Sequence, residues 1–506
     1  MIAFPYLDLR SAMMPKLKKS TFFAISCLLL LCSMWVNPVS ATEARDKTEV
    51  MRDIDEFMTR SMKANHIKAA SLAIANNDEV FYAKGYGTFE NGQSVTGGTP
   101  FPIASLSKSF TALAVLQLAD NGQIDLDAAY VSYFPELSPR DSRFRDITVR
   151  HLLNQTSGLN DKINPDMTRT PQFQSLDEAS RLISEVQLAH SPGTAYSYHN
   201  PNYVLLANLV ESVSGERFSD YLKSHIFEPL GMNHTYSVST TLQIDGNEAV
   251  PSGHYLSLGR SVSQSEPLWF IEGPAGIVST AEDMSLWMLA QYHGSLLSPD
   301  LMKQYHAAGA IGPYGMGWLA DPQDESGGRT ISHSGIFWTY KSEETVYLNE
   351  QLGIAVMFNS GINAFVNYSA FIDGIADIMR GEKPETSFVN GRNMEMIMIA
   401  LILATFVWGV YAYFRIRRKN QRLTINRLIL ITVGRLIPIL ILLSLSPLMT
   451  FIGGGRVLPW FGIWTTLSSP IIWLVVWSLV NLGHLACYYS IYVQNTKKGR
   501  ISKSMR

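Results

Sequence analysis

Cysteine is scarce in this chain of 506 residues, and all of it lies near the two ends. The three cysteines, Cys27, Cys32 and Cys487, each belong to an apolar run. The long middle of the chain can therefore hold neither a disulfide framework nor a cysteine-based metal site. A Gly-x-Ser-x-Gly elbow, a His-Glu-x-x-His pair and a phosphate-binding glycine loop are also missing. We accordingly expect no metal ion and no cofactor, and the central motif of an α/β-hydrolase is absent.

Acidic residues are almost missing from the C-terminal part, where residues 392–506 contain fourteen basic residues and one acidic residue. The same part contains three apolar runs long enough to span a membrane as helices. The predicted spans are about 394–414, 435–452 and 460–493. Basic residues gather in 415–427 and in the tail 494–506, which the positive-inside rule places in the cytoplasm.

The N-terminal end has the features of an export signal. Basic residues precede an apolar core, and a small-x-small cleavage site ends at Ala41. We therefore predict a signal peptide at 1–41, an exported domain at 42–388 and a membrane domain at 389–506. This organisation predicts a multi-pass protein of the bacterial inner (plasma) membrane, with the exported domain on the periplasmic or extracellular side and the C-terminus in the cytoplasm. The exported part, counted over 42–391, has a net charge of −18, which argues against nucleic-acid partners.

The exported domain has strand patterns at both ends. Residues 69–87 predict a hairpin around an Asn-Asn-Asp turn, and strand-like segments return after 314–318. Between about 128 and 310, helical patterns alternate with Pro-, Gly- and Asn-rich loops. This order predicts an α+β fold with one sheet built from both ends of the domain and a mostly helical insert beside it.

Ser105 and Lys108 form the one Ser-x-x-Lys pair that leads into an apolar helical pattern. A serine hydroxyl is a weak nucleophile until a base takes its proton, and a lysine one turn away can reach it. Such a lysine must be neutral, which requires burial or a neighbouring cation. A serine at a helix start is also a common N-cap, so this motif alone leaves both interpretations open.

Two further clusters strengthen the catalytic interpretation. Tyr198 could be held as a phenolate beside an ammonium and act as a base, and Asn200 could bind a peptide-like amide. The triplet Tyr198-His199-Asn200 also suits the start of a helix with an asparagine cap, which is the alternative interpretation. His333, Ser334 and Gly335 end a predicted strand whose edge could pair with an extended substrate. The next residue, Ile336, could offer its N–H to a developing oxyanion. A surface histidine is the alternative interpretation of His333.

In this order, the three clusters resemble the motifs of the serine β-lactamase and penicillin-binding-protein superfamily, Ser-x-x-Lys, Tyr-x-Asn and Lys-Thr-Gly. The resemblance covers about residues 55–380 and is closest to the class C-like branch of esterases, D-aminopeptidases and alkaline D-peptidases. It implies a β-lactamase-like antiparallel sheet flanked by helices, followed here by three transmembrane helices. It further implies that Ser105 is the nucleophile, that Lys108 and Tyr198 share proton transfer, and that the N–H groups of Ser105 and Ile336 form the oxyanion hole. His333 replaces the third-motif lysine, which weakens the case for β-lactamase activity.

The expected function is a membrane-anchored serine hydrolase that cleaves next to a D-amino acid or an acylated residue. A catalytic domain followed by three spans is similar to membrane peptidases that activate nonribosomal peptide prodrugs, such as the colibactin-activating peptidase. The expected partners are a small peptide or acylated D-aminoacyl substrate and the lipid bilayer. A peptidoglycan DD-peptidase, an esterase and a weak β-lactamase remain as alternatives. A membrane sensor that binds or is acylated without turnover is the alternative from another class.

Overall fold

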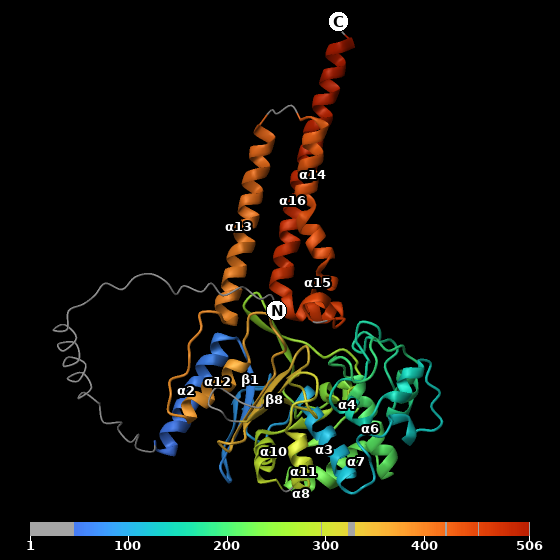
Figure 1. The fold of residues 1–506 in the computed structure, drawn as a ribbon. Coiled ribbons are helices and arrows are strands. Elements are labelled where there is room, and N and C mark those ends of the chain that lie inside the picture. The colour runs from blue at the N-terminus through green and yellow to red at the C-terminus, as the bar shows by residue number, and fades with distance from the viewer. Residues whose placement is uncertain (1–44, 295, 322–328, 420–422, 454, 505–506) are drawn as a thin grey trace, which may run out of the picture. The chain divides into compact units, whose positions relative to one another are not determined.

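The computed structural model describes residues 45–294, 296–321, 329–419, 423–453 and 455–504. The predicted signal peptide lies outside the described residues. The chain divides into two units, Met1–Arg52 and Asp53–Arg506. The described part of the first unit includes the beginning of α2 (Lys47–Ala64). The second unit holds a sheet, the helices around it and the apolar helices of the C-terminal part (Figure 1).

The largest sheet has six antiparallel strands in the order β2-β1-β11-β10-β9-β8. The strands are β1 (Ala69–Asn76), β2 (Glu79–Gly87), β8 (Leu319–Asp321), β9 (Thr330–Ile336), β10 (Lys341–Tyr347) and β11 (Leu352–Phe358). β1 and β2 form the hairpin predicted at 69–87, with Asn77 in its turn at φ +53°. β1 also pairs with β11, where Ala70 lies opposite Phe358. The prediction of one sheet built from both ends of the domain is therefore confirmed.

Helices cover both faces of this sheet. Every residue of β11 is buried, as expected for a strand with no solvent-facing side. Gly353 faces α10 (Ala281–His293), because a Cβ at this position would lie 2.6 Å from Cβ of Met288. Phe358 faces α12 (Ser369–Met379), where its ring lies 4.9 Å from that of Phe371. Residues 353 and 358 differ by an odd number of positions, so α10 and α12 lie on opposite faces.

The insert between β2 and β8 is mostly helical. Its helices and helical turns are η1 (Ala104–Leu106), α3 (Ser107–Asp120), η2 (Tyr130–Tyr133), η3 (Ser142–Asp146), α4 (Val149–Leu153), α5 (Leu176–Ser184), α6 (Pro201–Ser214), α7 (Phe218–Leu222), η4 (Lys223–Phe227), α8 (Glu228–Leu230), α9 (Thr241–Asp245), α10 and α11 (Pro299–Tyr305). α3 is buried without interruption from Ser107 to Leu116, so the residues at its start lie inside the domain.

The insert also contains short strands that the sequence analysis did not predict. They are β3 (Phe101–Pro102), β4 (Tyr236–Ser237), β5 (His254–Ser257), β6 (Arg260–Ser263) and β7 (Ile277–Ser279). β3, β7 and β4 form a three-stranded sheet, and β5 and β6 form a hairpin. Strands of two to four residues are too short to show an alternating pattern, which explains why the sequence analysis did not detect them.

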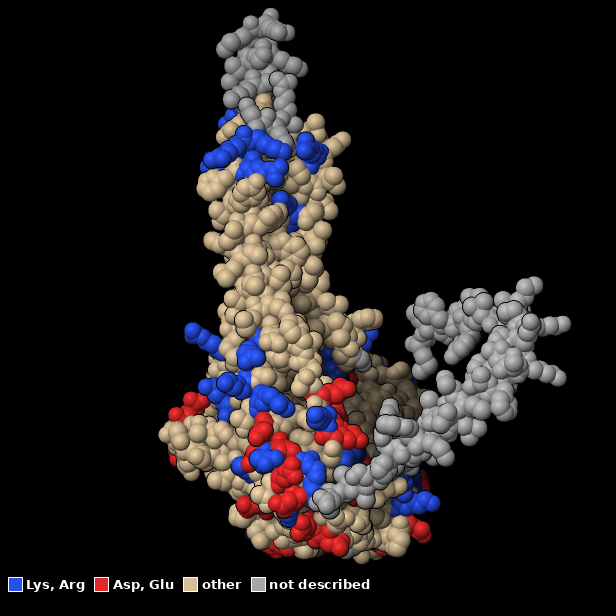
Figure 2. Space-filling view, turned by 90° about the vertical axis from the view of Figure 1, so that its left-hand side faces the viewer, with Lys and Arg blue, Asp and Glu red and all other residues tan. Residues whose placement is uncertain are grey.

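The C-terminal part consists of α13 (Gly391–Arg418), α14 (Ile425–Leu443), α15 (Leu445–Ile452) and α16 (Trp460–Ser504), with a kink in α16 at Leu467. Among the described residues, three helices are long and apolar enough to cross a membrane: Gly391–Arg418, Ile425–Leu443 and Trp460–Lys497. In Figure 2 the surface of this part is mostly tan, and lysines and arginines form a band near its far end. The last turn of α13 supplies Arg415, Arg417 and Arg418 to the basic surface.

The second of these helices differs from the predicted span at 435–452, because it begins at Ile425 and ends at Leu443. Arg435 therefore lies inside the helix instead of at its start. Its guanidinium donates to Asn481 Oδ1 at 2.8 Å and contacts His484 Nδ1 at 2.7 Å, both on α16. His484 Nε2 in turn contacts the carbonyl of Gly409 on α13 at 2.8 Å. These contacts give the Arg435 guanidinium polar partners inside the helical part. The charge of Arg435 therefore does not mark the start of a helix.

Candidate active site

Ser105 lies in η1, the helical turn that leads into α3. Ala104, directly before it, has φ +46°, a conformation that residues other than glycine seldom adopt. Strained backbone of this kind is often found at functional sites. No side-chain hydrogen bond caps η1 or α3, so the structure does not support the interpretation of Ser105 as an N-cap.

Lys108 lies on the first turn of α3, and its ammonium points at the serine. Nζ lies 3.0 Å from Ser105 Oγ and donates to the carbonyl of Pro274 at 2.9 Å. The side chain is completely buried. Burial lowers the pKa of Lys108 well below its usual value, the charge of Arg456 lowers this pKa further, and the charge of Asp166 opposes the change. A lysine in this environment can be neutral at physiological pH and accept a proton from Ser105.

Tyr198 lies in the loop before α6, with its ring centroid 4.9 Å from Lys108 Nζ. Burial raises the pKa of the Tyr198 phenol, while its hydrogen bond to Ser105 and the charge of Arg456 oppose the rise. The pKa of the lysine therefore falls and that of the phenol rises. These directions favour Lys108 as the base and a protonated Tyr198, instead of the phenolate considered from the sequence.

Asn200 is buried directly before α6, but its side chain does not cap that helix. Its Nδ2 donates to Asp166 Oδ2 at 2.6 Å, and its Oδ1 is buried without a hydrogen-bond partner among the described residues. The side chain predicted to bind a peptide-like amide therefore donates to a carboxylate of the protein through its nitrogen. The structure brings Ser105, Lys108 and Tyr198 together, whereas Asn200 faces Asp166.

β9 approaches the turn that carries the serine. A Cβ added to Gly335 would overlap both Ile103 O and Ser342 Oγ, so only glycine fits at this position. Ser342 Oγ donates to the same Ile103 carbonyl at 2.7 Å and ties β10 to η1. The backbone of β9 therefore lies beside the residues that precede Ser105. Ile336 follows Gly335 at the end of this strand, and the oxyanion role of its N–H stays a prediction.

His333 is buried, so the alternative interpretation as a surface histidine is wrong. Its Nε2 lies 3.2 Å from the Tyr314 hydroxyl, and its Nδ1 lies 2.8 Å from the carbonyl of Ser334. The ring centroid lies 6.1 Å from that of Tyr198. Burial lowers the pKa of His333 to about 3, and the charge of Lys108 contributes to this decrease. His333 is therefore neutral and cannot supply the positive charge of a third-motif lysine.

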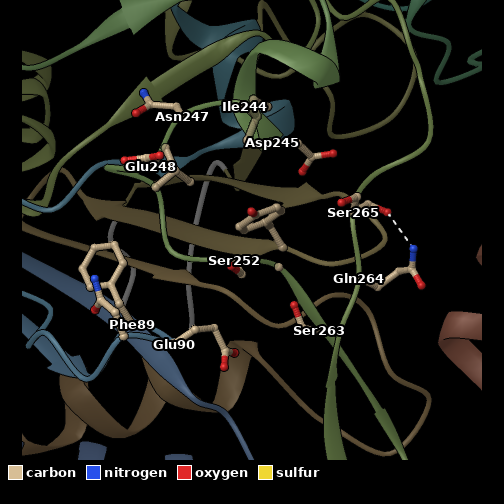
Figure 3. A pocket seen from close by; sticks show the side chains of 14 residues that line it. Phe89, Glu90, Ile244, Asp245, Asn247, Glu248, Ser252, Ser263, Gln264 and Ser265 are labelled. Atoms are coloured by element: carbon tan, nitrogen blue, oxygen red, sulfur yellow. Dashed lines mark hydrogen bonds between the residues drawn. The ribbon is translucent and has the colours of Figure 1, made fainter.

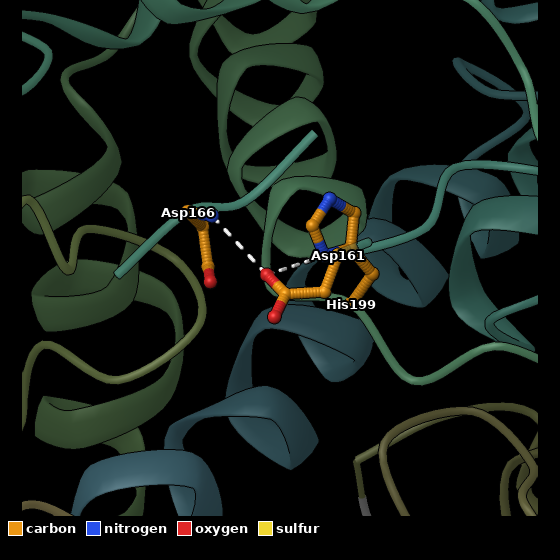
Figure 4. Close-up of side chains that lie close together, drawn as sticks. All are labelled: Asp161, Asp166 and His199. Atoms are coloured by element: carbon orange, nitrogen blue, oxygen red, sulfur yellow. Dashed lines mark hydrogen bonds and ion pairs between the residues drawn. The ribbon is translucent and has the colours of Figure 1, made fainter. Parts of the chain in front are cut away.

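Two buried carboxylates lie beside this site that the sequence analysis did not identify. Asp161 and Asp166 lie next to His199, and the ligating atoms of the three residues are within 4.8 Å of one another (Figure 4). Burial and the charge of Asp166 raise the pKa of Asp161. Burial disfavours the ionised form of Asp166, but the charges of Arg456 and His199 favour it, and the pKa of Asp166 is lowered. No local sequence pattern predicts this cluster.

The composition of the cluster would suit a cation, but its carboxylate oxygens already accept hydrogen bonds from the protein. Asp161 accepts from the backbone N–H groups of Asp166 at 3.2 Å and Val457 at 2.5 Å. Asp166 accepts from the N–H of Met167 at 2.7 Å and from Asn200. We therefore interpret the cluster as a structural contact with the segment that contains Val457.

A separate pocket of about 360 Å³ lies between α9 and the β5–β6 hairpin (Figure 3). Phe89, Asp245, Ser252 and Gln264 are among its lining residues. None of the predicted site residues lines it. It is therefore separate from the candidate site at Ser105.

Comparison with known proteins identifies the family. The family model described as beta-lactamase matches residues 54–370. The chain belongs to the beta-lactamase family. It is a serine hydrolase of the superfamily that includes β-lactamases and penicillin-binding proteins, so the resemblance found in the sequence is confirmed.

One known relative and two solved structures show what this chain is similar to. Protein flp of Staphylococcus aureus (strain MW2) is 27% identical over 405 residues, which cover 74% of this chain and 78% of that protein. The octameric penicillin-binding protein homologue from Pyrococcus abyssi is 25% identical, with a TM-score of 0.57 over 66% of this chain and 78% of that one. D-Alanine carboxypeptidase AmpC from Burkholderia cenocepacia is 19% identical, with a TM-score of 0.54 over 66% of this chain and 99% of that one. This last likeness is one of fold, and it agrees with the predicted α+β class.

Proposed function

We propose that this protein is a membrane-anchored, extracytoplasmic serine hydrolase that forms an acyl-enzyme on Ser105. The observation that carries the proposal is the 3.0 Å contact between Ser105 Oγ and the buried Lys108 Nζ. A neutral amine at this distance can activate a serine, whereas an N-cap serine would be bonded to a backbone N–H.

The chemistry follows from these positions. Lys108 accepts the Ser105 proton as Oγ attacks the carbonyl carbon of an amide or ester. The oxyanion that forms is stabilised by the N–H groups of Ser105 and Ile336. The carbon–nitrogen or carbon–oxygen bond then breaks, and the leaving group takes a proton delivered through Lys108 and Tyr198. Water attacks the Ser105 ester in a second step, releases the acid and returns the proton to the serine.

The substrate class is taken from the family resemblance. We propose an amide next to a D-amino acid or an acylated residue, as in a peptidase that activates a prodrug or matures a peptide. Asn200, His333 and Ser334 would line the substrate-binding region around Tyr198 and β9. Peptidoglycan DD-peptidase, esterase and weak β-lactamase activities are the alternatives. The neutral, buried His333 disfavours substrates held by a cation in the third motif.

The proposed location rests on the three apolar helices and on the basic residues between and after them. Residues 42–388 would lie outside the inner (plasma) membrane, after removal of the signal peptide at 1–41. Residues 389–506 would anchor the domain and place the C-terminus in the cytoplasm.

Mass spectrometry after treatment with a fluorophosphonate probe tests the proposal on the full chain. A mass adduct on Ser105 is expected in the wild type and should be absent in Ser105→Ala. Ser107→Ala is the matched control, because Ser107 Oγ accepts from the N–H of Ile277 and should not be needed for labelling. An adduct on another serine, or one that persists in Ser105→Ala, would refute the assignment of the nucleophile.

A panel of acyl-D-aminoacyl and acyl-L-aminoacyl amides then separates an enzyme from a sensor. Rapid hydrolysis of a D-configured substrate would support the peptidase. An adduct stable for hours would support a sensor that is acylated without turnover, and this outcome would contradict the proposed hydrolysis.

A further inference from the structure

The start of α16 is attached to the catalytic domain. Ser468 Oγ donates to the carbonyl of Leu256 on β5 at 2.8 Å, and the N–H of Leu258 donates to Ser469 Oγ at 2.9 Å. Gly462 lies against Trp338, because a Cβ at position 462 would be only 2.5 Å from the indole carbons. These contacts fix the position from which residues 455–459, the segment before α16, extend over the domain.

Residues 455–459 reach the candidate active site. The N–H of Val457 donates to Asp161 Oδ2 at 2.5 Å. Arg456 Cζ lies 5.4 Å from the centroid of the Tyr198 ring, and Lys108 Nζ lies 4.9 Å from the same centroid. Both distances are within the range of cation–π interactions. A residue of the C-terminal helical part and the predicted base of the exported domain therefore contact one aromatic ring.

The environment of Arg456 does not suggest an ordinary surface ion pair. Its Nε is buried and has no hydrogen-bond partner among the described residues. The carboxylates of Asp161 and Asp166, which lie near its charge, accept hydrogen bonds from other donors. The position of the guanidinium is instead defined by the Tyr198 ring and by the attachment of Val457.

We infer that Arg456 is a positioning residue of the hydrolase site, supplied by the segment between α15 and α16, and that it acts through Tyr198 and Lys108. This inference rests on the proposed function of those residues. It assigns the C-terminal helices a part in catalysis beyond anchoring.

The effect on Lys108 follows from the groups that surround its ammonium. Those that titrate or carry charge are Tyr198, Tyr203, Asp166, His199, His333 and Arg456. The charge of Asp166 favours the charged form of Lys108, and the charge of Arg456 disfavours that form. Burial makes both histidines neutral, because it lowers the pKa of His199 to about 4 and that of His333 to about 3. Loss of the Arg456 charge should therefore raise the pKa of Lys108, and Lys108 would then be protonated at a higher pH.

The test is the pH profile of kcat/KM for the purified full chain with an acyl-D-aminoacyl p-nitroanilide. Arg456→Gln should move the acidic limb of the profile up by about one pH unit. The rate should therefore fall about tenfold on that limb and recover toward the wild-type rate at high pH. Arg456→Lys retains the charge and should keep the limb near its wild-type position. Arg260→Gln, at an exposed arginine on β6, is the matched control. It should change neither the position of the acidic limb nor the rate.

An acidic limb that stays in place in Arg456→Gln would overturn the inference, whether the rate is unchanged or falls equally at every pH. If this variant does not fold, Val457→Pro provides the second test, because it keeps the arginine and removes the N–H bonded to Asp161. The same upward shift is expected, and an unchanged limb would overturn the inference. Absence of Ser105-dependent hydrolysis in the wild type would instead refute the proposed function.

Discussion

Lys108 Nζ lies 3.0 Å from Ser105 Oγ, and the lysine side chain has no exposed surface. The contact joins the first turn of α3 to η1, directly after the strained backbone of Ala104. A buried ammonium loses its hydration, so burial favours the neutral amine beside the Ser105 hydroxyl.

Ser105→Ala should reduce hydrolysis of an acyl-D-aminoacyl substrate by several orders of magnitude, because it removes the hydroxyl that forms the acyl-enzyme. The fold should persist, since the substitution leaves the backbone and the burial of Lys108 in place. Turnover and the thermal unfolding midpoint are measured on the same preparation. Activity above a tenth of the wild-type value would contradict the nucleophile assignment.

Lys108→Met should lower kcat by about 10²–10⁴-fold, the range for loss of a general base. Methionine has a similar length and is uncharged, so it suits a buried site. In the wild type, kcat/KM should rise with pH through the lowered pKa of Lys108, because the neutral amine is the active form. In the methionine variant this acidic limb should disappear. If the acidic limb remains in Lys108→Met, it arises from the titration of another group.

Reporter fusions test the proposed orientation. A fusion near residue 385 should behave as exported, and fusions at residue 420 and at the C-terminus should behave as cytoplasmic. The reason is the concentration of basic residues at 415–427 and in the tail. Export of the reporter at residue 420 would require the opposite orientation of α13.

Glu344 on β10 should make the stability of the domain depend on pH. Burial raises the pKa of this carboxyl from 4.5 to about 8. Between these values the folded state holds a proton that the unfolded state has released, so the free energy of unfolding decreases as pH rises. The slope for one such group is at most about 1.4 kcal/mol per pH unit.

Glu344→Gln should remove this contribution. The unfolding midpoint in detergent should therefore fall less between pH 5 and pH 8 in the variant than in the wild type. Glu136→Gln, at an exposed glutamate, should retain the wild-type dependence. Equal slopes in Glu344→Gln and the wild type would show that Glu344 is ionised in the folded protein.

The features that local sequence predicts well are those set by neighbouring residues. The approach of Ser105 and Lys108 follows from a three-residue spacing at a helix start, and the hairpin of β1 and β2 follows from two apolar runs around a turn. Tyr198 required the family resemblance, because its distance from Lys108 depends on how the insert folds. The apolar runs predicted helices, but the burial of His333 depends on packing between elements distant in the chain.

Arg456 and Asp161 show the limit of this approach. The sequence shows Arg456 only as a single basic residue between two predicted spans, and Asp161 only as an acid in a loop. Arg456 meets Tyr198, and Val457 meets Asp161, in a structure where α16 attaches to the β5–β6 hairpin through residues far apart in sequence. Likewise, α14 (Ile425–Leu443) includes Arg435, whose guanidinium contacts Asn481 and His484, and a hydropathy pattern does not record such partners.

The lack of space for a side chain at Gly335 restricts how this enzyme can be redesigned or can diverge. Any larger residue there would push β9 away from the turn that carries Ser105, so we expect a library that varies this position to consist mainly of inactive members. The adjacent Ile336 is 38% exposed, and its side chain can change while its backbone N–H stays in place. Changes in substrate range should therefore accumulate at position 336, next to a position that remains glycine.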